Sequence, residues 1–236
     1  MSLICQGFVF CWPGKVKSVC DIVSSMVIPV TVINSAENSK CDNWINIGTD
    51  SYFGNQFRKC LEMHKSGNVL LHIQGDTEYH NWDRLTHDAL KYIKKYNAGV
   101  YYPQVTNTSW TPDKMSVVAQ SSEDTNIKYI ACGDETVWFI HPAVISKCRE
   151  LKLFDLFDGL MFGFGWDLII CAVSHMLSMP VIRDYDHVIQ HEKGTNYKFH
   201  DAFCELKILL KSLPDEISSI VESMQNNHKE TMKLNL

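Results

Sequence analysis

The sequence predicts an α/β fold in which helices flank a mostly parallel sheet. An apolar run at residues 3–10, a helical repeat at 16–23 and a β-branched run at 30–33 follow one another in the strand, helix, strand order of a parallel pair. The run at 69–73 is nearly continuous in apolar residues, as expected for a strand covered on both faces. Of the 236 residues, 45% are hydrophobic and 21% are charged, which is typical of a globular protein.

The remaining elements of the first half alternate in the same way. After a polar segment, Asp50-Ser51 is a candidate cap for a helix that carries Phe53, Phe57 and Leu61 on one face. Asp83 is a candidate cap for the next helix, which Asn97-Ala98-Gly99 ends. A short strand is expected at residues 100–102.

The alternation loosens in the second half. Residues 110–126 are polar and are expected to be irregular, and two apolar runs between 127 and 140 are separated by Gly133-Asp134-Glu135. Pro142 begins a helix that reaches Leu151. A glycine-rich aromatic loop at 162–166 leads into a buried helix at 167–177.

The end of the chain is predicted to add a strand at 180–185, a segment at 187–197 that ends in a turn, and two amphipathic helices. No repeat or linker divides the sequence. We therefore expect one domain over 1–236, with a first half at 1–103, a second half at 104–198 and C-terminal helices at 199–236.

Charge and cysteine content restrict the class of protein. The 22 Lys and Arg residues against 27 Asp and Glu residues give a net charge of −5, which disfavours a general nucleic-acid coat protein. The nine cysteines are scattered and form no Cys-x-x-Cys pair, which indicates buried thiols rather than a disulfide framework or a zinc site. The N-terminus lacks a secretory pattern and the apolar stretch at 168–182 is too short for a bilayer, so we expect a cytoplasmic protein.

Polar residues that follow the strands are the first candidates for a site, because ligands bind beyond the carboxyl ends of parallel strands. Asp76 and Glu78 come directly after the most buried strand. Two carboxylates at this spacing in a loop can point oxygens at one hard cation, which could neutralise a diphosphate. The alternative is a turn in which Asp76 is a cap and Glu78 is solvated.

A second group of candidates lies late in the chain. Asp167 begins a helix, where a carboxylate acts either as a cap or as a general base behind the glycine loop. His191 is a candidate nitrogen ligand for the cation at Asp76, whereas His187 has no identifiable partner. Asp134 and Glu135 form another acidic pair, which also suits a plain hairpin turn.

Taken in order, these segments resemble a small glycosyltransferase of the GT-A fold, of the family 2-like type, over residues 3 to 200. The resemblance is carried by Val30-Thr31-Val32-Ile33-Asn34-Ser35, Tyr52-Phe53-Gly54-Asn55-Gln56-Phe57, Gln74-Gly75-Asp76-Thr77-Glu78, Trp138-Phe139-Ile140-His141-Pro142, Gly163-Phe164-Gly165-Trp166-Asp167 and the segment from Arg183 to Tyr197. The third of these stands where that fold keeps an Asp-x-Asp motif, and it departs from the motif at Glu78.

The resemblance implies a half-Rossmann sheet that binds a nucleotide-sugar, most often a UDP-sugar, with Mn²⁺ or Mg²⁺ as the cofactor. It implies metal ligation by Asp76, Glu78 and His191 and a catalytic base at Asp167. It implies donor binding by Asn34, Gln74, Asp76, Gly194, Thr195, Asn196 and Tyr197. It implies acceptor binding by Gly165, Trp166 and Asp134.

The acceptor is less defined. The segment from His191 to Tyr197 resembles nucleotide-sugar transferases of large tailed phages, some of which glycosylate hydroxymethylcytosine in double-stranded DNA. That would place the protein in a host cytoplasm. Candidate basic residues for a DNA-binding face are Lys91, Lys94, Lys95, Lys114, Lys193 and Lys198. The net charge of −5 opposes this acceptor, and a polysaccharide or glycan acceptor agrees equally well with the residues.

Two other classes are compatible with the same half-sheet. A sugar-nucleotide pyrophosphorylase needs a basic, glycine-rich phosphate loop after the first strand, and only Trp12-Pro13-Gly14-Lys15 follows here. A non-catalytic module would bind a nucleotide-sugar without transferring it. No membrane association and no obligate protein partner are expected.

Overall fold

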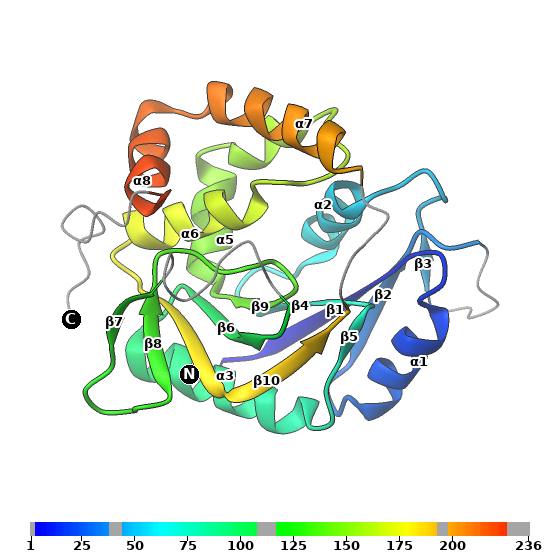
Figure 1. Cartoon of the computed structure of the whole chain (residues 1–236), viewed down its shortest axis with the longest axis horizontal. Helices are drawn as coiled ribbons and strands as arrows, with labels where there is room; N and C mark the ends of the chain where they lie inside the picture. The colour runs from blue at the N-terminus through cyan, green and yellow to red at the C-terminus, as the bar shows by residue number, and fades with distance from the viewer. Residues whose placement is uncertain (1–2, 38–43, 108–116, 193–197, 226–236) are drawn as a thin grey trace.

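The computed structural model describes residues 3–37, 44–107, 117–192 and 198–225 (Figure 1). The elements of the first half are β1 (Cys5–Cys11), α1 (Val16–Ser25), β2 (Val30–Asn34), β3 (Ile45–Asn46), α2 (Phe53–Met63), β4 (Val69–Gln74), β5 (Thr77–Glu78), α3 (Trp82–Tyr96) and β6 (Val100–Val105). Those of the second half are β7 (Val117–Gln120), β8 (Ile127–Ile130), β9 (Val137–Ile140), α5 (Pro142–Glu150), the 3-10 helix η1 (Leu153–Phe157), α6 (Trp166–Met176), β10 (Val181–His191), α7 (Phe199–Ser212) and α8 (Asp215–Gln225).

The described strands form one mixed sheet in the order β3-β2-β1-β4-β9-β6-β10-β8-β7, and β5 pairs with β10. Strands β3, β2, β1 and β4 are parallel, as are β6 and β10. Strand β9 lies antiparallel between β4 and β6. The α/β architecture predicted from the sequence is therefore confirmed, with the parallel half on the N-terminal side.

Two hydrophobic cores cover the two faces of the sheet (Figure 1). Side chains alternate along β1, so that Phe8 packs towards α2, α5 and α6 while Val9 packs towards α1 and α3. Helices α7 and α8 extend the first core through residues such as Leu209 and Val221. None of the helices in the described ranges combines the length and the apolarity that a bilayer span requires.

Several predicted boundaries are wrong. Helix α3 is capped by Asn81, whose side chain accepts from the Arg84 N–H at 3.2 Å, whereas Asp83 accepts from the Val27 N–H in the loop before β2. Helix α2 begins after Tyr52 and not after Asp50-Ser51. At each helix start, several polar residues lie within a few positions of one another. The backbone conformation, and not the residue type alone, decides which of them acts as the cap.

The second half is more regular than expected. Residues 117–120, predicted to be irregular, form β7, and the two segments predicted at 180–185 and 187–197 include one long strand, β10. The acidic pair at 134–135 is not a hairpin turn, because β8 pairs with β7 and β10 while β9 lies between β4 and β6. Residues 131–136 therefore cross from one part of the sheet to another.

The cysteine prediction holds for the residues that the structure describes. Five cysteines are buried and form no disulfide, at Cys11, Cys60, Cys132, Cys148 and Cys171. Burial raises the pKa of Cys5 to about 12, so this thiol stays protonated. Cys41 lies outside the described residues.

Candidate active site

The carboxyl ends of β1 and β2 are joined by a side chain that the sequence analysis did not assign to the site. Gln56 of α2 is buried, and its Nε2 donates to the Cys11 carbonyl at 2.8 Å and to the Ile33 carbonyl at 3.1 Å. Asn34 is also buried there. Its Nδ2 donates to Asn46 Oδ1 at 2.6 Å, and its Oδ1 accepts from the Ala36 N–H at 3.0 Å. Asn34, which we predicted to bind the nucleotide-sugar, therefore lies at the expected edge of the sheet. Its side chain is hydrogen-bonded to other residues of the protein.

Asp76 and His191 meet at this edge although they are far apart in sequence. Asp76 follows β4, His191 ends β10, and Asp76 Oδ2 lies 3.3 Å from His191 Nε2. The short strand β5 brings them together, because Thr77 is the antiparallel partner of His191. Gly75 is needed before Asp76, since a Cβ there would lie 2.5 Å from the Phe10 carbonyl oxygen.

Asp76 is 4% exposed, and its second oxygen, Oδ1, is buried without a hydrogen-bond partner. The two ring nitrogens of His191 are also buried, and Nδ1 has no hydrogen-bond partner while Nε2 has only the 3.3 Å contact with Asp76. A buried carboxylate oxygen without a donor is costly unless something else satisfies it. This pair is therefore a candidate for binding a cation.

The protonation of His191 responds to the acidic residues around it. Burial lowers its pKa, but the hydrogen bond and charge of Asp76, together with the charges of Asp134 and Glu192, outweigh burial and raise the pKa above its usual value. The protein without a cation thus favours a positive charge at this position. A bound cation would supply the same charge, and His191 would have to lose its proton.

Two further groups frame the pair. Lys15 Nζ lies 2.6 Å from Glu192 Oε2, and the Glu192 N–H donates to the Asp76 carbonyl at 3.4 Å. The predicted ligand Glu78 is exposed and lies towards α1, where the pKa of Lys17 is raised mainly by Asp21 and to a smaller extent by the charge of Glu78.

Within the described ranges, no group of three or more His, Cys, Asp and Glu side chains is arranged to hold a metal ion on its own. Asp76 and His191 nevertheless suit a cation that a substrate helps to bind. Mg²⁺ commonly uses one or two carboxylates and completes its coordination with water and substrate phosphates. The unpartnered Oδ1 of Asp76 fits such a site.

Asp167 lies in the first turn of α6 and is 3% exposed. Its Oδ2 is 4.0 Å from Cys132 Sγ, and its charge acts on Glu135. Burial and the charges of Asp167 and Asp134 raise the pKa of Glu135 well above its usual value, and Glu135 Oε2 is buried without a partner. Two carboxyl groups thus lie close together, and their environments favour a proton on Glu135.

The three residues predicted to bind the acceptor substrate lie in different surroundings. Trp166 is completely buried and stacks on Phe157 with ring centroids 3.5 Å apart, and its role in acceptor binding stays a prediction. Gly165 has φ 105° and packs against Leu209 of α7. Asp134 Oδ1 accepts from the Thr136 N–H and Oγ1, and its charge reaches His191.

Of the remaining residues predicted to bind the nucleotide-sugar donor, the structure describes only Gln74. Gln74 is half-buried at the end of β4, and its backbone N–H donates to the Thr136 carbonyl at 2.9 Å, which links β4 to the start of β9. Gly194, Thr195, Asn196 and Tyr197 lie outside the described residues. Their role as donor-binding residues stays a prediction.

No protein-family model and no curated protein matches the sequence. Among solved structures, the chain is similar to TarS of S. aureus in complex with UDP-GlcNAc, with a TM-score of 0.59 and 12% identity over 98% of this chain and 74% of that chain. A second crystal structure of S. aureus TarS 1–349 gives a TM-score of 0.57 and 11% identity over 99% of this chain and 74% of that chain.

The chain is also similar to GalNAc-T7 with UDP, GalNAc and Mn²⁺, with a TM-score of 0.59 and 12% identity over 94% of this chain and 54% of that chain. Identities this low show a shared fold, and the fold is that of the GT-A glycosyltransferases. The fold implied by the resemblance is therefore confirmed.

Proposed function

We propose that this chain is a metal-dependent glycosyltransferase that moves a hexosyl or pentosyl group from a nucleotide-sugar, a UDP-sugar in the first instance, to an acceptor hydroxyl. The observation that carries the proposal is the buried, unpartnered Oδ1 of Asp76, next to His191 and at the ligand-binding edge of a GT-A sheet. The structural neighbours solved with UDP-GlcNAc and with UDP, GalNAc and Mn²⁺ support this choice of donor and cofactor.

Asp76 and His191 would hold Mn²⁺ or Mg²⁺, and Glu78, being exposed, would act from outside the direct coordination shell. When bound, the cation supplies positive charge to the leaving diphosphate. The negative charges of Asp76, Asp134 and Glu192 outnumber the positive charges of Lys15 and protonated His191, so the site without a cation would repel a diphosphate.

For the acceptor step we propose Asp167 as the general base. It is the buried carboxylate at the start of α6, and an ionised carboxylate is favoured at a helix N-terminus. It would remove the proton of the acceptor hydroxyl as the hydroxyl oxygen bonds to the anomeric carbon and the bond from that carbon to the diphosphate breaks, which releases UDP. Glu135, which favours its protonated form, would leave Asp167 as the ionised member of the pair.

We further propose that the chain works as a single transferase unit, with the donor half at 1–103, the acceptor half at 104–198 and the C-terminal helices at 199–236. The sheet supports a single unit, because β10 of the second half pairs with β5 and β6 of the first half. Asp76 and His191 come from different halves, so neither half contains the complete site.

For the acceptor we propose 5-hydroxymethylcytosine in double-stranded DNA, with glycans as the alternative. Lys198 Nζ lies 5.7 Å from the centre of the Tyr52 ring, which contacts the Phe162 ring of the glycine loop at a tilt, so one basic group lies beside this loop. The α3 face contributes less, because Lys95 is paired with Asp124 at 2.5 Å and Glu123 at 3.0 Å. Lys114 and Lys193 lie outside the described residues.

The first experiment is a thermal-shift and calorimetric screen of nucleotide-sugars with and without Mn²⁺, followed by a UDP-release assay. We expect stabilisation by a UDP-sugar that depends on Mn²⁺. Stabilisation without any transfer would favour the non-catalytic module, and pyrophosphate release from a nucleoside triphosphate and a sugar phosphate would favour the pyrophosphorylase. Both outcomes would contradict the proposal.

The second experiment addresses the acceptor. Duplex DNA with and without hydroxymethylcytosine is incubated with the enzyme and the donor, and its mass is measured. We expect one added sugar mass for each modified base. An unchanged mass, together with transfer to an oligosaccharide, would remove DNA as the acceptor and leave the transferase proposal intact.

A further inference from the structure

Strand β10, which carries His191, is interrupted by a bulge. Asp184 is paired with Pro103 of β6, and the next pair is Val188 with Gln104, so residues 185–187 have no partner in β6. Pro103 has no N–H to contribute to the sheet, which makes this position suited to a break in pairing.

The bulge decides which side chain reaches the site. Ile182 before the bulge and Ile189 after it belong to the same core, although one number is even and the other odd. In an unbroken strand, residues of the same parity share a face. The bulge therefore turns His191 to the face of Ile189, whereas an unbroken strand would turn the exposed Gln190 there.

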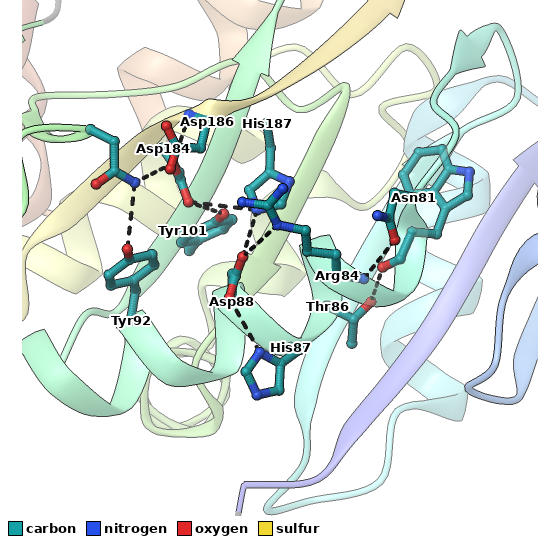
Figure 2. A network of polar contacts seen from close by, with 12 residues as sticks. Asn81, Arg84, Thr86, His87, Asp88, Tyr92, Tyr101, Asp184, Asp186 and His187 are labelled. Atoms are coloured by element: carbon teal, nitrogen blue, oxygen red, sulfur yellow. Dashed lines mark hydrogen bonds and ion pairs between the residues drawn. The ribbon is translucent and has the colours of Figure 1, made fainter.

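Two completely buried residues anchor the two ends of the bulge (Figure 2). Asp184 accepts from the Tyr101 hydroxyl at 2.9 Å, from Asn126 Nδ2 at 2.8 Å and from the Asp186 N–H at 2.9 Å. His187, for which the sequence suggested no partner, has its Nε2 3.1 Å from Asp88 Oδ2 of α3.

The second nitrogen of His187 connects the bulge to the other half of the site. His187 Nδ1 lies 2.7 Å from the hydroxyl of Tyr79, which follows β5. Tyr79 belongs to the segment that begins at Asp76, and His187 belongs to the strand that ends at His191. Beyond this contact, the two segments pair at Glu78 with Gln190 and at Thr77 with His191.

Asp88 keeps His187 in place from the helix side. Burial raises the pKa of Asp88, but hydrogen bonds from His87 and His187 and the charges of His187 and Arg84 outweigh it and lower the pKa. Asp88 is therefore ionised at neutral pH and is a strong acceptor for the imidazole.

We propose that His187 and Tyr79 are positioning residues whose contact fixes the bulge of β10 against the segment after Asp76, and so holds His191 opposite Asp76. The inference rests on the proposed function only for the identity of the ligand at that pair. A partner beyond the direct ligands typically changes metal affinity about 10- to 100-fold.

The test compares Tyr79→Phe, His187→Ala and His187→Gln with the matched control Tyr96→Phe. The Tyr96 hydroxyl likewise bonds side chains far along the chain, Ser121 and Asp124, but these belong to the loop between β7 and β8 and not to the bulge of β10. Mn²⁺ affinity is measured by electron paramagnetic resonance in the presence of UDP. Hydrogen exchange is measured over residues 188–192 and 181–184.

We expect Mn²⁺ binding about 10-fold weaker in Tyr79→Phe and up to about 100-fold weaker in His187→Ala, with partial recovery in His187→Gln and no change in Tyr96→Phe. Exchange should accelerate at 188–192 and not at 181–184. In turnover assays, the KM for Mn²⁺ should rise while kcat at saturating Mn²⁺ is retained.

Wild-type affinity and unchanged exchange in Tyr79→Phe would overturn the proposal, and this variant decides alone if His187→Ala does not fold. If wild-type protein binds no Mn²⁺ with UDP, the proposed function fails. The exchange data then decide the positioning role by themselves, since they require no ligand.

Discussion

Trp138 and His72 form a hydrogen bond between neighbouring strands in the core. Trp138 Nε1 donates to His72 Nδ1 at 2.9 Å, the two residues are direct partners in the pairing of β9 with β4, and both are 0% exposed. Because Nδ1 accepts this bond, the imidazole is neutral. Burial lowers the pKa of His72 to about 3, against a smaller opposing effect of the Glu135 backbone.

This pair predicts a loss of stability in mild acid. The unfolded chain takes up a proton at His72 below about pH 6.5 while the folded protein does not, so the stability is complete above pH 6.5 and falls by about 1.4 kcal/mol per pH unit towards pH 3. His72→Gln keeps an acceptor for Trp138 and removes the titration. Urea unfolding between pH 7.5 and 4.5 should show a flatter profile for this variant, and equal slopes would contradict the assignment.

Removal of the Asp76 carboxylate is expected to weaken cation binding strongly. Asp76→Asn should weaken Mn²⁺ binding in the presence of UDP by about 100-fold or more, because a direct ligand contributes at least as much as an outer partner. Glu78→Gln, at an exposed neighbouring position, should change it less than about threefold. Calorimetry on both variants checks the pair, and equal losses would place Glu78 in direct contact with the cation.

Amide substitution should lower kcat strongly at Asp167 and only slightly at Glu135. Asp167→Asn removes the proposed base and should lower kcat about 10²- to 10⁴-fold, while donor binding is retained. Glu135→Gln replaces a carboxyl group that already favours its neutral form, so kcat should stay within about threefold of wild type. Single-turnover transfer measures both. A large loss in Glu135→Gln with little loss in Asp167→Asn would reverse the two roles.

Gln56 is expected to shape the donor edge of the sheet. Gln56→Leu leaves the Cys11 and Ile33 carbonyls without their side-chain donor, which should cost about 1–3 kcal/mol and weaken UDP-sugar binding as the ends of β1 and β2 separate. Gln120→Leu is the matched control, since Gln120 Nε2 also bonds two carbonyls, those of Thr125 and Ile127, at the far edge of the sheet. Urea unfolding and calorimetry should show a binding defect in Gln56→Leu alone.

Local patterns in the sequence predicted the order and type of most elements. The apolar runs at 30–33 and 69–73 are local signals, and they correspond to β2 and β4 because burial on both faces demands continuous apolar residues. The position of Asp76 after β4 followed from the same signal. His191 was a candidate partner of Asp76 from the sequence before any resemblance was considered, and the structure brings the two side chains into contact.

The contacts between segments that are distant in sequence became known only from the folded structure. Tyr79 and His187 are 108 positions apart, and no local pattern predicts that their side chains touch. The bulge that turns His191 inward depends on pairing with β6, and the burial of Trp166 depends on Phe157 packing against it. Such contacts form between elements that the whole sheet brings together, so residue spacing along the chain does not predict them.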